Sequence, residues 1–347
     1  MASPEATGPG GKGEWGGCRE VVEALRRLAG SRVAVFLHQN PDGDSLGSSL
    51  ALADALRRLG AQPTVVAEDS FPAVYRFLQG TEGIQKAGDL AGTAFEAAIM
   101  PDVASPERLG ASLALAETIP LWINIDHHGT NPGFGHARWV DPGRSSVGEM
   151  VLEVLWGLGV PISLQAAEAI YTAIMTDTGS FRYESVTPRV LRYAAYLVEQ
   201  GVNPAKVAQQ VYESMSASSF RLLAAALNSV RLEAGGRVAW LAVTRDMLAA
   251  AGAQRSETEG LVNYARSIEG VEVALLFMEE PGDQIRISFR AKEWADVGRV
   301  AAGLGGGGHR RAAGATLPGP LDEAVRVALA AVMEHLNEAG PAAAGEV

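Results

Sequence analysis

The stretch Leu121-Trp-Ile-Asn-Ile-Asp126-His127-His128 joins a short apolar run to three consecutive side chains that can bind a metal. A short apolar run of this kind is typical of a buried β-strand. Packing does not explain an acid followed directly by two imidazoles, whereas carboxylate and imidazole are common metal ligands. The stretch therefore predicts a strand whose carboxyl end belongs to a metal and phosphate site.

Other apolar runs of strand length precede this one, and helical patterns alternate with them. The expected strands are Val33–Leu37, Thr64–Ala67 and Phe95–Met100, and the expected helices are Val21–Leu28, Leu46–Leu59, Val147–Leu158, Ser163–Thr176 and Pro188–Gln200. Alternation of this kind favours an α/β fold with a mostly parallel sheet flanked by helices. In such sheets, ligand sites lie at the carboxyl ends of the strands.

The C-terminal part of the chain predicts a second, smaller α/β unit. Its expected strands are Val238–Val243, Val271–Glu279 and Gln284–Arg290, and its expected helical segments are Glu257–Ile268 and Val297–Leu304. A helical stretch over Pro204–Asn228 is interpreted as a connector. We therefore expect a disordered tail (1–17), a metal-rich domain (18–195), a helical connector (196–230) and a second domain (231–340).

Composition limits the classes of partner. The net charge of −11 argues against broad binding to duplex nucleic acid, yet a cation-filled pocket on an acidic protein can hold a short anionic substrate. No apolar run is long enough to cross a bilayer, so no membrane partner is expected. The single cysteine, Cys18, rules out an internal disulfide and fits a reducing cytoplasm.

An acidic loop follows the first expected strand. His38, Asp42 and Asp44 lie in His38-Gln-Asn-Pro-Asp-Gly-Asp44, and Ser45 is expected to begin a helix. Pro and Gly in the loop favour a tight turn that aims these side chains at one point. A solvated turn with a helix N-cap is the alternative for Asp-Gly-Asp alone, and the strand and His38 before it favour a bound cation.

Three further acids end apolar segments. Asp102 and Asp126 follow strands, and Asp177 closes an apolar helix, where an acid opposes the helix dipole. Each alone fits an ordinary turn or capping residue. Together with the acidic loop they exceed the ligand set of one ion and suit two divalent cations, with Mn²⁺ favoured and Mg²⁺, Co²⁺ or Zn²⁺ as alternatives.

A glycine run lies in the second unit, embedded between apolar segments. Bare glycines let backbone N–H groups approach a phosphate, and the basic residues after them add positive charge. A flexible linker is the alternative for the run, and ordinary surface positions are the alternative for the two arginines elsewhere in the unit. The candidate substrate contacts are Gly306, Gly307, Gly308, His309, Arg310, Arg266 and Arg290.

Taken in order, these motifs resemble those of the DHH phosphoesterase superfamily. The matching residues are His38, Asn40-Pro-Asp42-Gly-Asp44, Asp102, Asp126-His127-His128 with Asn131, and Asp177-Thr-Gly. The glycine run is similar to that of the DHH-associated substrate domain. The two-domain length most resembles the nanoRNase and pAp-phosphatase branch, the bifunctional oligoribonucleases.

The resemblance implies roles for these residues. His38, Asp42 and Asp102 would hold one Mn²⁺, and Asp44, Asp102, His127 and Asp177 the other, with Asp102 as the bridge. His128 would contact the scissile phosphate and Asp126 would orient its neighbours, so the catalytic set is His128, Asp126 and Asp102. Asn131, His309 and the glycines would meet the substrate. Pro101, directly before Asp102, departs from the family pattern and must end the strand.

The expected activity is two-metal hydrolysis of short single-stranded RNA or DNA, from di- to pentanucleotides, to mononucleotides, together with dephosphorylation of pAp. A phosphodiesterase for cyclic or linear dinucleotides (cyclic di-AMP, pApA) is the alternative of the same chemistry. A non-catalytic nucleotide sensor is the alternative from another class. A homodimer is left open.

Overall fold

The computed structural model describes residues 16–68, 70–258 and 260–338. The chain divides into two compact units between Ser214 and Met215. This point lies inside the segment expected to be a connector, and the predicted domain limits stay a prediction. Residues 1–15 of the expected disordered tail lie outside the described residues.

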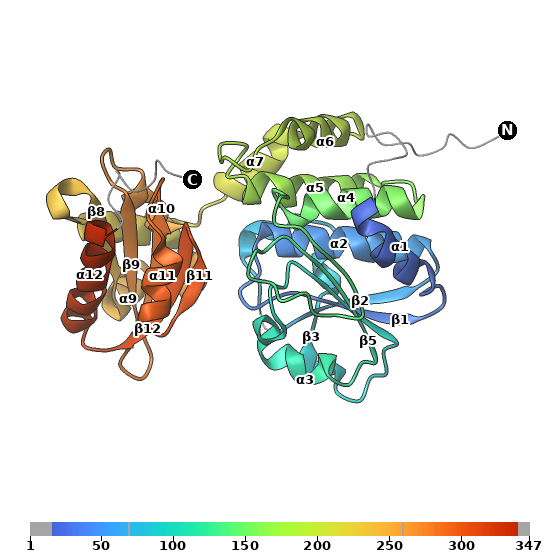
Figure 1. Cartoon of the computed structure of the whole chain (residues 1–347), viewed down its shortest axis with the longest axis horizontal. Helices are drawn as coiled ribbons and strands as arrows, with labels where there is room; N and C mark the ends of the chain where they lie inside the picture. The colour runs from blue at the N-terminus through green and yellow to red at the C-terminus, as the bar shows by residue number, and fades with distance from the viewer. Residues whose placement is uncertain (1–15, 69, 259, 339–347) are drawn as a thin grey trace. The chain divides into compact units, whose positions relative to one another are not determined.

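The first unit is built on a six-stranded sheet in the order β3-β2-β1-β4-β5-β6 (Figure 1). All neighbouring strands are parallel, which confirms the predicted α/β class. The strands are β1 (Arg32–Phe36), β2 (Gln62–Ala67), β3 (Gln85–Lys86), β4 (Ala97–Pro101), β5 (Leu121–Asp126) and β6 (Ala137–Val140). The two short edge strands, β3 and β6, were not predicted.

Helices cover both faces of this sheet because successive strand side chains point to opposite sides. In β1, Val33 and Val35 belong to the larger core under α1, α2, α4 and α5, whereas Ala34 and Phe36 belong to the core beneath α3. The helices are α1 (Arg19–Arg26), α2 (Gly43–Arg58), α3 (Leu113–Ala116), α4 (Val147–Leu158), α5 (Leu164–Asp177), α6 (Pro188–Glu199) and α7 (Pro204–Tyr212). Helix α2 begins two residues before the expected Ser45.

Helices α2, α4 and α5 approach one another closely at glycines. A Cβ atom on Gly47 of α2 would stand 2.2 Å from the carbonyl oxygen of Ala169, and one on Gly148 of α4 would stand 2.5 Å from the Cβ of Ala173. Only glycine permits such contact. The start of α2 therefore lies against the end of α5, where Asp177 stands.

The second unit contains a mixed six-stranded sheet in the order β11-β12-β10-β9-β8-β7. Only the β8–β9 pair is parallel within the described residues. The strands are β7 (Arg231–Glu233), β8 (Val238–Val243), β9 (Val273–Glu280), β10 (Gln284–Ala291), β11 (Gly307–His309) and β12 (Ala312–Pro318). The helices are α8 (Ala217–Asn228), α9 (Arg245–Ala251), α10 (Leu261–Arg266), α11 (Val297–Gly303) and α12 (Leu321–Glu338).

Two expectations for this region need correction. The stretch Pro204–Asn228 is two helices, α7 and α8, which belong to different units. The segment Glu257–Ile268 contains only a 3₁₀ turn at Arg255–Thr258 and the short helix α10, because Gly260 adopts a positive φ of 79° between them. No helix of the described residues is both long enough and apolar enough to span a membrane.

Candidate metal centre

The predicted metal ligands meet where the strand order of the parallel sheet reverses. Strands β1 and β4 are hydrogen-bonded neighbours although β2 and β3 lie between them in sequence, and a crevice forms at such a point. His38 follows β1 and Asp102 follows β4. Asp102 has a left-handed φ of 61°, and its N–H donates to the Ile125 carbonyl at 2.9 Å. Pro101 is the last residue of β4, as the sequence predicted.

The first group of ligands is formed by His38, Asp42 and Asp102. The Nε2 atom of His38 lies 3.4 Å from Oδ2 of Asp102 and 3.9 Å from Oδ1 of Asp42. Asp42 is also the N-cap of α2, because its Oδ1 accepts from the N–H groups of Asp44 and Ser45 at 3.0 Å each. The N-cap that the sequence offered as the alternative for this loop is thus present, and it holds the Asp42 carboxylate in place next to His38.

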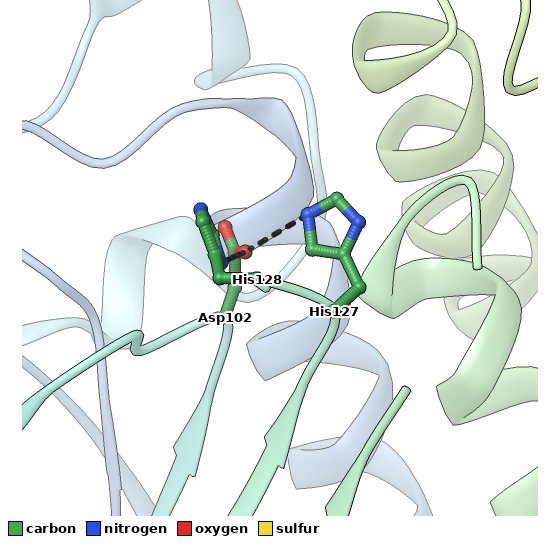
Figure 2. A group of neighbouring side chains, drawn as sticks. All are labelled: Asp102, His127 and His128. Carbon is green, nitrogen blue, oxygen red and sulfur yellow. Dashed lines mark ion pairs between the residues drawn. The ribbon is translucent and has the colours of Figure 1, made fainter. Parts of the chain in front are cut away.

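The second group is formed by Asp44, His127 and Asp177. The Nε2 atom of His127 lies 3.9 Å from Oδ2 of Asp44 and 3.6 Å from Oδ2 of Asp177. The same atom lies 3.7 Å from Oδ1 of Asp102. Figure 2 shows the two imidazoles of His127 and His128 on either side of the Asp102 carboxylate. Asp102 therefore joins the two groups.

These separations fit metal ligands better than hydrogen bonds. Distances of 3.4–3.9 Å are too long for N–H···O bonds. Two ligands that each lie about 2.0–2.2 Å from one ion are separated by roughly 3–4 Å. Oδ1 of Asp102 is buried and makes no hydrogen bond within the described part of the chain. A carboxylate oxygen left in this state indicates a place for a cation.

Hydrogen bonds on the outer side of each imidazole direct Nε2 toward the carboxylates. Nδ1 of His38 lies 2.8 Å from the carbonyl oxygen of Gln39, and Nδ1 of His127 lies 3.3 Å from that of Arg144. A carbonyl oxygen only accepts, so each Nδ1 carries a proton, and Nε2 is the nitrogen that can bind a metal once it has lost its own proton. The resulting neutral tautomer is the one that a metal requires.

Asp44 is held from three directions. Its carboxylate accepts from the backbone N–H groups of Val147 at 2.7 Å and Gly148 at 2.8 Å, which are the first residues of α4. The hydroxyl of Ser48 donates to it at 3.1 Å. The helix N-terminus thus orients a buried carboxylate that also faces His127.

The electrostatics of the cluster indicate a deficit of positive charge. Burial and the neighbouring Asp177 raise the pKa of Asp44 to about 7, and burial raises that of Asp177 to about 6. Burial and Asp44 raise the pKa of Asp102 well above its usual range. Burial disfavours charge on His127, but Asp177, Asp44 and Asp102 outweigh it and raise the imidazole pKa to about 10. Without a cation, protons must neutralise the cluster.

His128 shares Asp102 with His127, because its Nδ1 lies 3.6 Å from Oδ1 of Asp102, but it also has a closer partner. Its Nδ1 lies 2.7 Å from Oδ1 of Asp126, a fully buried carboxylate. Burial opposes charge on Asp126, but the hydrogen bonds from His128 and Asn131 outweigh burial and lower its pKa. Asp126 therefore fixes the orientation of His128, and the roles that the resemblance implies for these two residues stay predictions.

Asn131 takes part in the support of Asp126. Its amide nitrogen donates to Oδ2 of Asp126 at 2.7 Å and to Oδ1 of Asn124 at 2.9 Å, and its oxygen accepts from the N–H of Gly133. The buried Asn124 in turn donates to the Met100 carbonyl at 2.9 Å. A contact between Asn131 and substrate stays a prediction.

The candidate substrate contacts of the second unit lie apart from each other in sequence. Arg266 ends α10 and Arg290 lies in β10, both half-buried, and Arg310 is exposed. The side chain of His309 lies outside the described residues. Gly307 is open, whereas a Cβ on Gly306 would stand 2.1 Å from the Gly314 carbonyl oxygen. The glycine run is thus an edge strand, β11, rather than a flexible linker.

Several supporting residues were not predicted from the sequence. They are Asn124, the carbonyl of Arg144 and the N–H groups of Val147 and Gly148. Backbone groups carry no sequence signal of their own. The Ser145-Ser146 pair before the Val147–Leu158 helix was the available hint, since serine is a common N-cap.

Two family models match the chain. Residues 32–174 match the DHH family, N-terminal domain, and residues 236–338 match the DHHA1 domain. The bifunctional oligoribonuclease and PAP phosphatase NrnA of Thermus thermophilus is 36% identical over 94% of this chain and 96% of its own length.

Solved structures show the same architecture. An exopolyphosphatase-related protein from Bacteroides fragilis has a TM-score of 0.86 and 26% identity, covering 92% of this chain and 96% of its own. RecJ from Thermus thermophilus, in complex with Mn²⁺, has a TM-score of 0.54 and 17% identity over 92% of this chain and 55% of its own, which supports the fold alone. With the ordered motifs and these matches, the chain belongs to the DHH family.

Proposed function

We propose that this protein is a phosphoesterase, dependent on two divalent metal ions, that hydrolyses short oligoribonucleotides to mononucleotides and dephosphorylates pAp to AMP. The observation that carries the proposal is the set of three overlapping three-ligand groups, two of which contain Asp102 and two of which contain His127. The NrnA relative, 36% identical over nearly the whole chain, supports the choice of substrates.

The residues fit such ions by their chemistry. Hard carboxylates mixed with imidazole suit Mn²⁺, which we propose as the native metal, with Mg²⁺, Co²⁺ or Zn²⁺ as alternatives. His38, Asp42 and Asp102 would hold one ion, and Asp44, His127 and Asp177, again with Asp102, would hold the other. When bound, the two ions supply Lewis-acid stabilisation of the phosphoryl oxygens and lower the pKa of water.

The chain's own residues orient and bind the substrate. Asp126 accepts from Nδ1 of His128 and so fixes the orientation of this imidazole beside Asp102. We propose that the imidazole binds a phosphoryl oxygen. The glycine-rich β11, His309, Arg310, Arg266 and Arg290 are proposed to bind the remainder of the nucleotide.

The decisive assay uses 5′-labelled RNA from two to twenty-four nucleotides with Mn²⁺, and pAp alongside. We expect hydrolysis to be fastest on the shortest chains and to yield mononucleotides. Rates on pApA and cyclic di-AMP are measured in the same experiment. Faster hydrolysis of these dinucleotides than of the RNA series would indicate the dinucleotide phosphodiesterase instead of the oligoribonuclease. Absence of Mn²⁺ binding and of any hydrolysis would instead favour the nucleotide sensor.

Two further expectations belong to the proposal. The lone Cys18 is buried, which is compatible with a reducing cytoplasm as the place of action. Light scattering of the purified protein would decide between a monomer and the homodimer that the sequence left open.

A further inference from the structure

Arg108, an exposed residue that no sequence motif singled out, places its guanidinium beside His38 of the metal centre. The residue lies in the 3₁₀ segment Pro106–Ser112, shortly after Asp102. Its Nη2 atom lies 3.3 Å from Nδ1 of His38. Arg108 therefore places a positive charge next to His38, on the Nδ1 side of its imidazole.

The backbone around Arg108 is held firmly. Its carbonyl oxygen accepts from the N–H of Gln39 at 2.7 Å, and the following Leu109 is fully buried in the core beneath the sheet. Gly110 has a φ of 56°, and a Cβ there would stand 2.3 Å from the Gln39 amide nitrogen and 2.5 Å from Oε1 of Glu68. The position of Arg108 is therefore a property of the packed fold.

The short contact between Arg108 and His38 is not a hydrogen bond. Nδ1 of His38 carries its proton toward the Gln39 carbonyl oxygen, so it has no lone pair for the guanidinium. Within the described residues, no carboxylate forms an ion pair with Arg108. The guanidinium is therefore available to an anion, and a phosphate offers the oxygens that a guanidinium binds best.

The charge of the site points the same way. Four carboxylates, from Asp42, Asp44, Asp102 and Asp177, balance two divalent ions, which leaves the negative charge of an incoming phosphoryl group uncompensated. We propose that Arg108 binds a non-bridging oxygen of the phosphoryl group that is hydrolysed, on the His38 side. The inference rests on the proposed function and adds to it a charged group that stabilises the transition state.

The test compares Arg108→Ala and Arg108→Lys with the control Arg192→Ala, which removes an equally exposed arginine on α6. The kcat/KM on a dinucleotide and on pAp, the affinity for AMP by calorimetry and the affinity for Mn²⁺ are measured on the full chain. We expect Arg108→Ala to lose about 10²- to 10³-fold in kcat/KM on both substrates and to bind AMP more weakly. The affinity for Mn²⁺ should not change. Arg108→Lys should retain part of the kcat/KM, because lysine keeps the positive charge but cannot donate two parallel hydrogen bonds to one phosphate.

The proposal is overturned if Arg108→Ala stays within about threefold of the control on both substrates. A loss confined to pAp also overturns it, because Arg108 would then contact a terminal phosphate. Failure of the proposed function is seen separately, as a wild-type protein inactive on both substrates. AMP affinity unaltered by Arg108→Ala would then still refute the phosphoryl contact.

Discussion

The carbonyl oxygen of Arg144 lies 3.3 Å from Nδ1 of His127 and so decides which nitrogen of that imidazole faces the carboxylates. Arg144 is itself held, because its guanidinium pairs with Asp141, Glu149 and Glu153. The metal centre therefore depends on a buried ionic network behind it. Loss of a hydrogen bond that orients a metal-binding imidazole typically lowers the metal affinity by about 10- to 100-fold.

Asp102 is the residue whose loss should be most severe. We expect Asp102→Ala to lower kcat/KM on a dinucleotide by at least about 10³-fold, because the carboxylate belongs to the first ligand group and also faces His127 of the second. Mn²⁺ stoichiometry, measured by electron paramagnetic resonance, should fall as well. Asp89→Ala, at an exposed position of the same unit, is the control. Full activity of Asp102→Ala would remove the two-metal interpretation.

Asp126→Asn tests the orientation of His128. An asparagine has one oxygen, yet both His128 and Asn131 donate to this side chain, so one of them must lose its acceptor. We expect kcat to fall about 10²-fold while Mn²⁺ affinity is nearly retained, since Asp126 belongs to neither three-ligand group that holds an ion. Steady-state kinetics and a Mn²⁺ titration check this. A parallel loss of metal binding would show that Asp126 acts on the ligands instead.

Gly148→Ala should act on the metal centre through packing. The new Cβ would stand 2.5 Å from Ala173 and must push the start of α4 away from Asp44. We expect a loss of about 1–3 kcal/mol in the free energy of unfolding, together with weaker Mn²⁺ binding. Denaturant melts and metal titrations measure the two effects. Gly88→Ala, where the added atom meets open space, should change neither.

The metal-free protein should lose stability as the pH rises. Asp44 and Asp177 have raised folded-state pKa values of about 7 and about 6, so the folded state binds more protons than the unfolded state between about pH 4 and those values. His127, with a pKa of about 10, extends the same trend from about pH 6.5 upward. Stability should therefore be highest at the acidic end of this window and decline toward pH 10.

Thermal melts with chelator and with Mn²⁺ measure this trend. Because divalent ions replace the protons, the stabilisation by Mn²⁺ should grow with pH, and binding should release protons. The melting temperature of the metal-free protein should fall from pH 5 to pH 9. A rise over the same range would contradict the assigned cluster of carboxylates.

Adjacent glycines of β11 allow fold and binding to be separated. Gly308 has a φ of 143° and a Cβ there would stand 2.5 Å from the Cα of Ala313, whereas Gly307 is open. Gly308→Ala should lower the melting temperature. Gly307→Ala should melt like the wild type but raise KM for a dinucleotide if β11 receives the nucleotide. An unchanged KM for Gly307→Ala would argue against that role.

Much of the site was predictable because its ligands are side chains with a clear chemical signature at strand ends. His38, Asp102 and His127 could be placed at one sheet edge from the apolar runs before them. The supporting bonds could not, because the Arg144 carbonyl and the N–H groups of α4 act through their positions in space. Arg108 could not be predicted either, since only the structure places it beside His38.

The fold shows the same division. Central strands were predicted from buried apolar runs, but β3 and β6 at the edges of the first sheet are two and four residues long and carry little pattern. In the second unit, β11 is made largely of glycine, which lacks the side chains that reveal a strand. Helix α12 was missed although its pattern is amphipathic, so that error was one of interpretation.

The reversal of strand order between β1 and β4 has a consequence for biosynthesis. A nascent chain that has emerged as far as Asp102 holds every member of the first ligand group, yet the second group waits for His127 and then Asp177. Asp44 also lacks its helix partner until α4 exists. The ligands of the His38 position are thus all synthesised before those of the His127 position are complete.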